Sequence, residues 1–113
     1  MKQTTMTPNQ YQNLAMRTCN LRGGEKELHA LMGISSEIGE LHGIYQKFYQ
    51  GHTFDPNHVK KECGDILWFL TEYIDCAGWT LEEIMETNIE KLKKRYPDGF
   101  EEERSLHREK GDL

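Results

Sequence analysis

The sequence has few of the residues that mark disulfide-rich, zinc-binding or membrane proteins. Its three cysteines, Cys19, Cys63 and Cys76, are odd in number and form no Cys-x-x-Cys motif, so neither a disulfide framework nor a structural zinc site is expected. No stretch approaches the roughly 18–20 apolar residues of a membrane helix, and the first ten residues lack the apolar run of a signal peptide. We therefore expect a soluble cytoplasmic protein with reduced cysteines and no membrane partner.

Positive charge is also scarce. The 14 basic residues are outnumbered by 19 acidic ones, which gives a formal net charge of −5. Such a chain repels phosphate backbones unless a cation intervenes, so a nucleic acid partner is not expected. The 113 residues have room for one domain, and a hydrophobic content of 36% gives a monomer only a thin core. Buried contacts between subunits, and hence a homo-oligomer, are therefore expected.

Apolar residues recur at steps of three and four along most of the chain, which indicates helices, and no sustained alternation indicates strands. Caps such as Thr7 with Pro8, Asp55 with Pro56 and the box starting at Thr80 mark helix starts. Glycines and Pro97 mark helix ends. Four helices are expected, from residue 8 to about 21–24, and over about 25–50, 56–77 and 81–96.

The second and third helices each carry an apolar heptad seam, and the short turn between them requires the two to run antiparallel. The fold class that we predict is all-α. Residues 1–100 should form a four-helix bundle-like subunit around this central antiparallel helix hairpin, and the subunit should oligomerise. Residues 101–113, which are mostly charged, should form a solvated C-terminal tail.

Two pairs of carboxylates stand out within the expected hairpin. Glu37 and Glu40 lie three residues apart in the second helix, as do Glu62 and Asp65 in the third, so each pair shares one helical face. In heptad notation Glu37 and Glu62 occupy position g, and Glu40 and Asp65 position c. Both pairs therefore lie on the same flank of the hairpin and at nearly the same level.

These carboxylates need a counter-charge, because two of them about 6 Å apart repel by roughly 3 kcal/mol at an effective dielectric constant near 20. Their helical neighbours are mainly apolar residues and glycine, and only Asp65 has a nearby base, Lys61. A solvated acidic face fits this pattern poorly, whereas a site for a divalent cation fits well. Oxygen ligands favour Mg²⁺, with Mn²⁺ as an alternative. A di-iron site would use Glu-x-x-His motifs, and His42 lies off the acidic face.

The fourth helix offers complementary charge. Asn88, Lys91 and Arg95, the polar trio below, lie on one side of this helix at steps of three and four. Cations near a helix C-terminus are stabilising in any case. Together with an oxygen-lined metal site, however, the trio indicates a binding site for a polyphosphate.

The segments SEIGELHG, KECGDILWFL and NIEKLKKRYPDGF resemble the MazG-like branch of the all-α nucleoside triphosphate pyrophosphohydrolases, over about residues 25–100. This resemblance implies a homodimer or tetramer that hydrolyses a nucleoside triphosphate to the monophosphate and pyrophosphate with Mg²⁺. Many members carry an additional Glu beside each acidic pair, where this chain has Ser36 and Lys61. By position, the resemblance implies four metal ligands, Glu37, Glu40, Glu62 and Asp65, and three phosphate contacts, Asn88, Lys91 and Arg95.

Attack of water on the α-phosphorus needs one carboxylate as the general base and fixed positive charge on the departing pyrophosphate. Glu40 is the candidate base, although geometry must make this choice, and Lys91 and Arg95 suit the second role. Two alternatives remain open. One is the same fold acting on dUTP, dCTP or phosphoribosyl-ATP, and the other is a non-enzymatic helical module that holds a structural cation.

Overall fold

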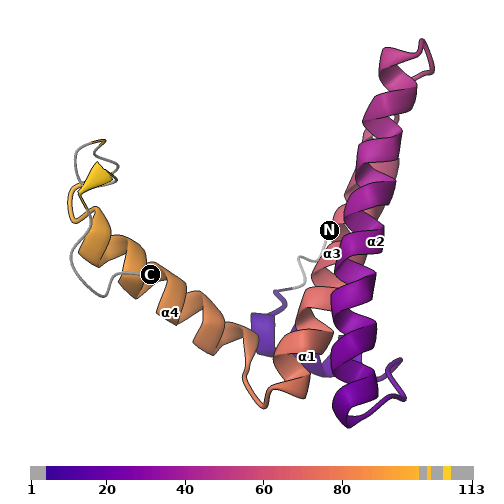
Figure 1. Ribbon diagram of the computed structural model, residues 1–113. Helices are drawn as coiled ribbons and strands as arrows, with labels where there is room; N and C mark the ends of the chain where they lie inside the picture. Colours follow the sequence, from indigo (N-terminus) through magenta and orange to yellow (C-terminus); the bar gives the residue numbers. More distant parts are fainter. Residues whose placement is uncertain (1–4, 100–101, 103–105, 108–113) are drawn as a thin grey trace.

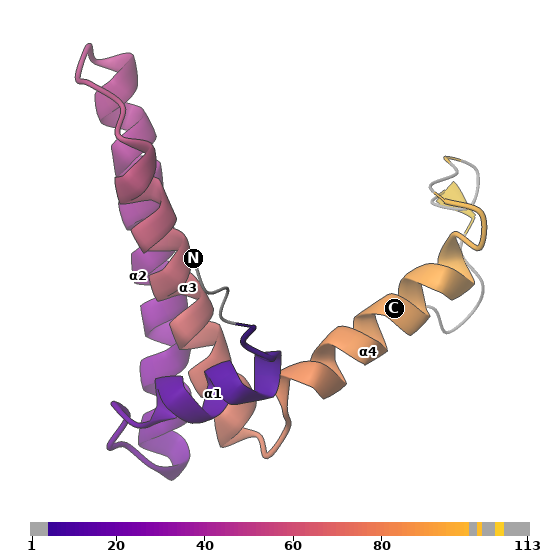
Figure 2. The ribbon, with the colours of Figure 1, turned by 180° about the vertical axis from the view of Figure 1, so that it is seen from behind.

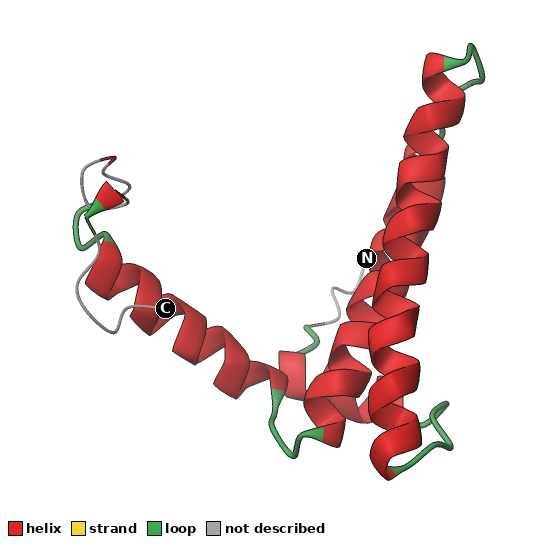
Figure 3. Ribbon diagram, in the orientation of Figure 1, coloured by secondary structure: helices red, strands yellow, loops and turns green. Residues whose placement is uncertain are grey.

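The structure, a computed structural model, describes residues 5–99, 102 and 106–107, and this part consists of helices joined by loops and turns, with no β-strand (Figure 3). The predicted all-α class is therefore confirmed. Of the predicted tail over residues 101–113, only residues 102, 106 and 107 lie within the described part. No described helix combines the length and hydropathy of a membrane-spanning segment. The helices are α1 (Pro8–Met16), α2 (Gly23–Tyr49), α3 (Pro56–Cys76) and α4 (Leu81–Arg95).

Side-chain caps start three of these helices at the predicted residues. Thr7 and Thr80 each form a capping box with the third residue of the helix that follows, and the Asp55 carboxylate accepts a hydrogen bond from the Asn57 amide at 2.9 Å. These contacts satisfy backbone donors that have no partner within the helix. Helix α1 ends at Met16, earlier than predicted, and the Thr18 hydroxyl donates to the Ala15 carbonyl in the turn that follows.

Helices α2 and α3 lie side by side and are called the α2–α3 pair (Figures 1 and 2). The chain turns over residues 50–55, where Gly51 adopts a φ of 100°, and α3 returns along α2. A fully buried carboxylate, Glu72, lies near the C-terminal end of α3. It pairs with His29 Nδ1 at 2.9 Å and accepts a hydrogen bond from the Cys19 thiol at 3.1 Å. Burial, and then this hydrogen bond, raise the pKa of Cys19.

Helix α1 crosses the α2–α3 pair near the end opposite the turn over residues 50–55 (Figures 1 and 2). There the Trp68 indole N–H donates to the Ala15 carbonyl at 3.0 Å. Helix α4 packs against α1 and then points away from the pair (Figures 1 and 2). The described helices therefore do not close into the bundle-like subunit that the sequence predicts. The physical reason is that hydrogen bonds to α1 fix the start of α4, while Met85, Ile89 and Leu92 on its apolar side remain exposed among the described residues.

The buried apolar core of one chain is small. Among the described hydrophobic residues, only Ala15, Ala30, Ile74 and Leu81 are buried. Large apolar side chains remain exposed along the α2–α3 pair and along α4, and extensive exposed apolar surface is typical of interaction sites. The exposed residues include Leu28, Leu31, Met32, Ile38, Tyr45, Phe48, Leu67, Leu70, Met85, Ile89 and Leu92.

Candidate metal centre

The structure brings together three of the four predicted carboxylates. Glu37 on α2 faces Glu62 and Asp65 on α3, and one oxygen of each lies within 4.8 Å of an oxygen of the others. The spacing of three residues places Glu62 and Asp65 on one face of α3. We call these three residues the acidic cluster.

Glu40, the fourth predicted ligand, is exposed and is not part of the acidic cluster. Asp65 shares the heptad position of Glu40 but lies in the cluster, so heptad position alone does not separate the two carboxylates. The negative charge of Glu40 nevertheless contributes to the raised pKa of Glu37. Glu40 therefore lies beside the cluster, on the solvent side.

Glu62 is the most buried member of the acidic cluster, with 12% of its side chain exposed. Its Oε1 lies 3.5 Å from His58 Nε2. Its Oε2 is buried and has no hydrogen-bond partner among the described residues. A buried carboxylate oxygen without a partner loses its hydration without compensation, which is costly. This oxygen is therefore the clearest indication that a cation belongs in the cluster.

The electrostatics of the acidic cluster point the same way. A hydrogen bond with Glu62, burial, and the charges of Glu62, Asp65 and Glu40 raise the pKa of Glu37 to about 7. Without a cation, the surroundings of Glu37 therefore favour its protonated form. Within the described part of the chain, no lysine or arginine forms an ion pair with these four carboxylates. Lys61, the base nearest to Asp65 in the sequence pattern, forms no ion pair with these carboxylates in the described part of the chain.

Helix α1 also comes close to the acidic cluster. Burial, and then the negative charge of Asp65, raise the pKa of Tyr11. Tyr11 precedes Gln12, which contacts the start of α4. One short helix therefore borders both the cluster and α4.

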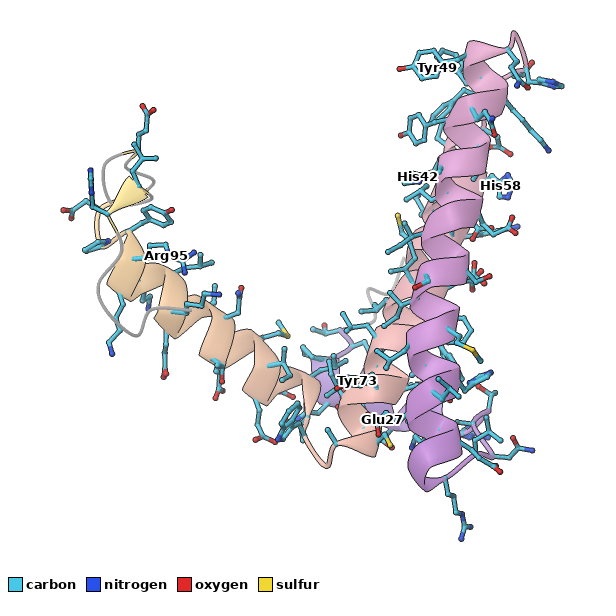
Figure 4. All side chains as sticks on the ribbon, in the orientation of Figure 1. Glu27, His42, Tyr49, His58, Tyr73 and Arg95 are labelled. Carbon is cyan, nitrogen blue, oxygen red and sulfur yellow. The ribbon has the colours of Figure 1, made fainter. Side chains whose placement is uncertain are left out.

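The donor set of the acidic cluster fits a hard divalent cation. It consists of carboxylate oxygens, one of which is buried without a partner, and it includes neither histidine nor cysteine. Figure 4 shows His42 on the side of the α2–α3 pair that faces α4, and His58 on the opposite side. Because Glu62 follows His58 by one turn and contacts it, the cluster lies away from His42. The structure therefore gives no support to a di-iron site that uses His42.

The polar trio lies apart from the acidic cluster of its own chain. Asn88 lies at the middle of α4 and Lys91 one turn further on, both exposed, and Arg95 is the last residue of the helix. Figure 4 shows Arg95 at the end of α4 farthest from the α2–α3 pair, across the open space from it. One chain therefore does not bring the trio and the cluster together.

Two buried polar residues, Glu72 and Gln12, were not identified from the sequence. Gln12 is 5% exposed and contacts the start of α4. The sequence contains one indication of this role: Gln12 lies among the apolar residues of α1, beside Tyr11 and close to Ala15. A polar side chain on a buried helix face must find hydrogen-bond partners. Glu72 gives the same signal beside Tyr73.

A comparison with family models adds an independent finding. The family model described as the MazG nucleotide pyrophosphohydrolase domain matches residues 26–100, which is more than half of the chain. Comparisons with curated proteins and with solved structures gave no significant match. The matched region contains the whole acidic cluster and the polar trio, so the resemblance drawn from the sequence motifs is confirmed. The chain belongs to the MazG nucleotide pyrophosphohydrolase family.

Proposed function

We propose that this protein hydrolyses a nucleoside triphosphate to the nucleoside monophosphate and pyrophosphate in a reaction that depends on Mg²⁺. The observation that carries the proposal is the acidic cluster, with its buried and unpartnered Glu62 oxygen, in a chain of the MazG family. Such a cluster suits Mg²⁺, and Mn²⁺ is the alternative.

The carboxylates divide into two roles. Glu37, Glu62 and Asp65 would hold the metal ion, which, when bound, neutralises the triphosphate and polarises its phosphoryl oxygens. Glu40 is the fourth acidic residue of the site and our candidate for the general base. Because Glu40 is exposed beside the cluster, its carboxylate is available to accept a proton from the attacking water.

The polar trio would bind the phosphates. Lys91 and Arg95 carry fixed positive charge, which stabilises the charge that develops on the departing pyrophosphate. Asn88 adds a neutral donor on the same side of α4. Without such groups and the metal ion, a chain of net charge −5 would repel its substrate.

We infer that the trio reaches the acidic cluster of a second copy, so that the working unit is a homodimer or a pair of dimers. The cluster lies near His58, on the side of the α2–α3 pair that faces away from α4 of the same chain (Figure 4). Met85, Ile89 and Leu92 form an exposed apolar stripe on α4. At about 100° per residue, the trio lies on the flank next to this stripe. Packing the stripe against the exposed α2–α3 pair of a second copy would therefore bring the trio alongside that pair.

The test uses the purified full chain and a panel of nucleotides, namely the common triphosphates, dUTP, dCTP and phosphoribosyl-ATP. We expect release of pyrophosphate with Mg²⁺ and none after chelation. Asp65→Asn should keep the helical circular dichroism spectrum and lose the activity. Stabilisation by Mg²⁺ without turnover of any nucleotide would contradict the proposal and would indicate a structural cation in a non-enzymatic module.

A further inference from the structure

Side chains of α1 hold part of the first turn of α4. The first four amides of a helix lack partners within it. Here the Leu81 amide donates to Gln12 Oε1 at 2.7 Å, and the Glu82 amide donates to Asn9 Oδ1 at 3.1 Å. The Asn9 amide donates in return to Glu82 Oε2 at 3.1 Å. Two of the four unpaired donors of α4 therefore end on α1, and the capping box of Thr80 and Glu83 satisfies the other two.

Gln12 also connects α4 to the rest of the fold. Its Nε2 donates to the Trp79 carbonyl and to Asp75 Oδ1, each at 3.0 Å. The other oxygen of Asp75 accepts from Lys26 Nζ at 2.6 Å. Burial opposes ionisation of Asp75, but the hydrogen bonds from Lys26 and Gln12 lower its pKa overall. One chain of polar contacts thus links α2, α3, α1 and the start of α4.

These contacts matter because, within its own chain, α4 has little else to fix its direction, and this direction decides how it meets a second copy. It points away from the α2–α3 pair, and α1 is its main helical neighbour (Figures 1 and 2). From Leu81 to Arg95, at a rise of 1.5 Å per residue, α4 extends for about 21 Å. A tilt of about 10° at its base would displace its far end by about 4 Å, more than phosphate contacts tolerate.

We propose that Asn9 and Gln12 are positioning residues of the reaction, which set the direction of α4 and thereby place Lys91 and Arg95 against the bound triphosphate. This inference rests on the proposed function, and it assigns a role to side chains that touch neither the metal ion nor the nucleotide. Loss of the contacts should weaken nucleotide binding and leave the acidic cluster intact.

The test compares matched single variants of the full chain. Asn9→Ala removes the acceptor for the Glu82 amide. Asn9→Asp keeps an acceptor, with a negative charge that a helix N-terminus favours. Gln12→Glu keeps the acceptor for Leu81 and removes the donor to both Asp75 and the Trp79 carbonyl, which leads into α4. The control is Trp68→Phe, which removes a hydrogen bond between α1 and α3 and leaves the contacts between α1 and α4 unchanged.

We expect KM for the nucleotide to rise about tenfold or more in Asn9→Ala and Gln12→Glu, because α4 loses its orientation. Mn²⁺ affinity should stay unchanged. Asn9→Asp should restore KM, and Trp68→Phe should not alter it. In Asn9→Ala, hydrogen exchange at the Glu82 amide should accelerate, which reports loss of the contact independently of activity.

Two results would overturn the inference. One is faster exchange at Glu82 with an unchanged KM, and the other is an equal rise of KM in Trp68→Phe. An active wild-type protein with either result would leave the proposed function intact. A wild-type protein that turns over no nucleotide would instead contradict the proposed function, and this inference with it.

Discussion

The ring of Phe69 on α3 occupies the space that a Cβ atom on Gly33 of α2 would need. Gly33 is buried, and it is the only described glycine at which an added Cβ would have a neighbour within 4 Å. It lies one helical turn from the acidic cluster, since Glu37 follows Gly33 by four residues and Asp65 precedes Phe69 by four. The absence of a side chain at Gly33 thus helps to set the separation of the carboxylates.

Gly33→Ala should therefore destabilise the protein and weaken metal binding. The added methyl must displace the Phe69 ring or the helix, at a typical cost of about 1–3 kcal/mol. The measurements are thermal unfolding and Mn²⁺ titration. Gly43→Ala is the control, because nothing lies within 4 Å of its added Cβ, and it should stabilise α2 by up to ~1 kcal/mol. Equal stability of the two variants would show that the Phe69 contact is unimportant.

Glu62→Gln should abolish the metal-dependent activity. The substitution keeps the shape of the side chain and removes one charge. Loss of a residue that only hydrogen-bonds to a metal ligand typically lowers activity by about 10–100-fold. Loss of a ligand itself should have a larger effect, of roughly 100-fold or more. Without metal the variant should melt at a higher temperature than wild type, because repulsion from Glu37 and Asp65 is relieved. Glu27→Gln, an exposed change on the same helix pair, should alter neither quantity.

The stability of the metal-free protein should fall as pH rises from about 5 to 8. The pKa of Glu37 in the folded protein is raised to about 7, so between its unfolded value and about 7 the folded state binds more protons than the unfolded state. Stability then decreases with rising pH. Mg²⁺ competes with the proton and should reverse the trend. Melting temperatures in chelator and in Mg²⁺ test this, and Glu37→Gln should flatten the slope in chelator.

Two inactive variants should restore activity when mixed, if α4 serves the site of a second copy. Glu62→Gln disables the acidic cluster and Lys91→Ala disables the polar trio. Random exchange makes half of the dimers mixed, and each mixed dimer has one intact site of two, so about a quarter of the wild-type activity should return. Unfolding and refolding the two variants together provides the exchange. Activity that stays at the level of the separate variants would place the trio and the cluster in one chain.

The sequence predicted the helices well because the signals that start them are local. Thr7, Asp55 and Thr80 bond to amides two or three residues ahead, so a short window contains the whole interaction. The acidic cluster could also be predicted largely from the sequence, since helical spacing fixes the face on which Glu62 and Asp65 lie. The separation of Glu40 from the cluster could not be predicted in this way, because it depends on how far apart the two helices pack.

The amino-acid order alone determined an all-helical chain, its carboxylate pairs and its family. Only the tertiary structure decided where α4 points, because that direction depends on contacts such as those of Asn9 with Glu82 and Gln12 with Leu81. These partners are 73 and 69 residues apart in the chain. No local pattern encodes such a pairing, since a glutamine or asparagine side chain can bond to any backbone amide that the fold brings to it.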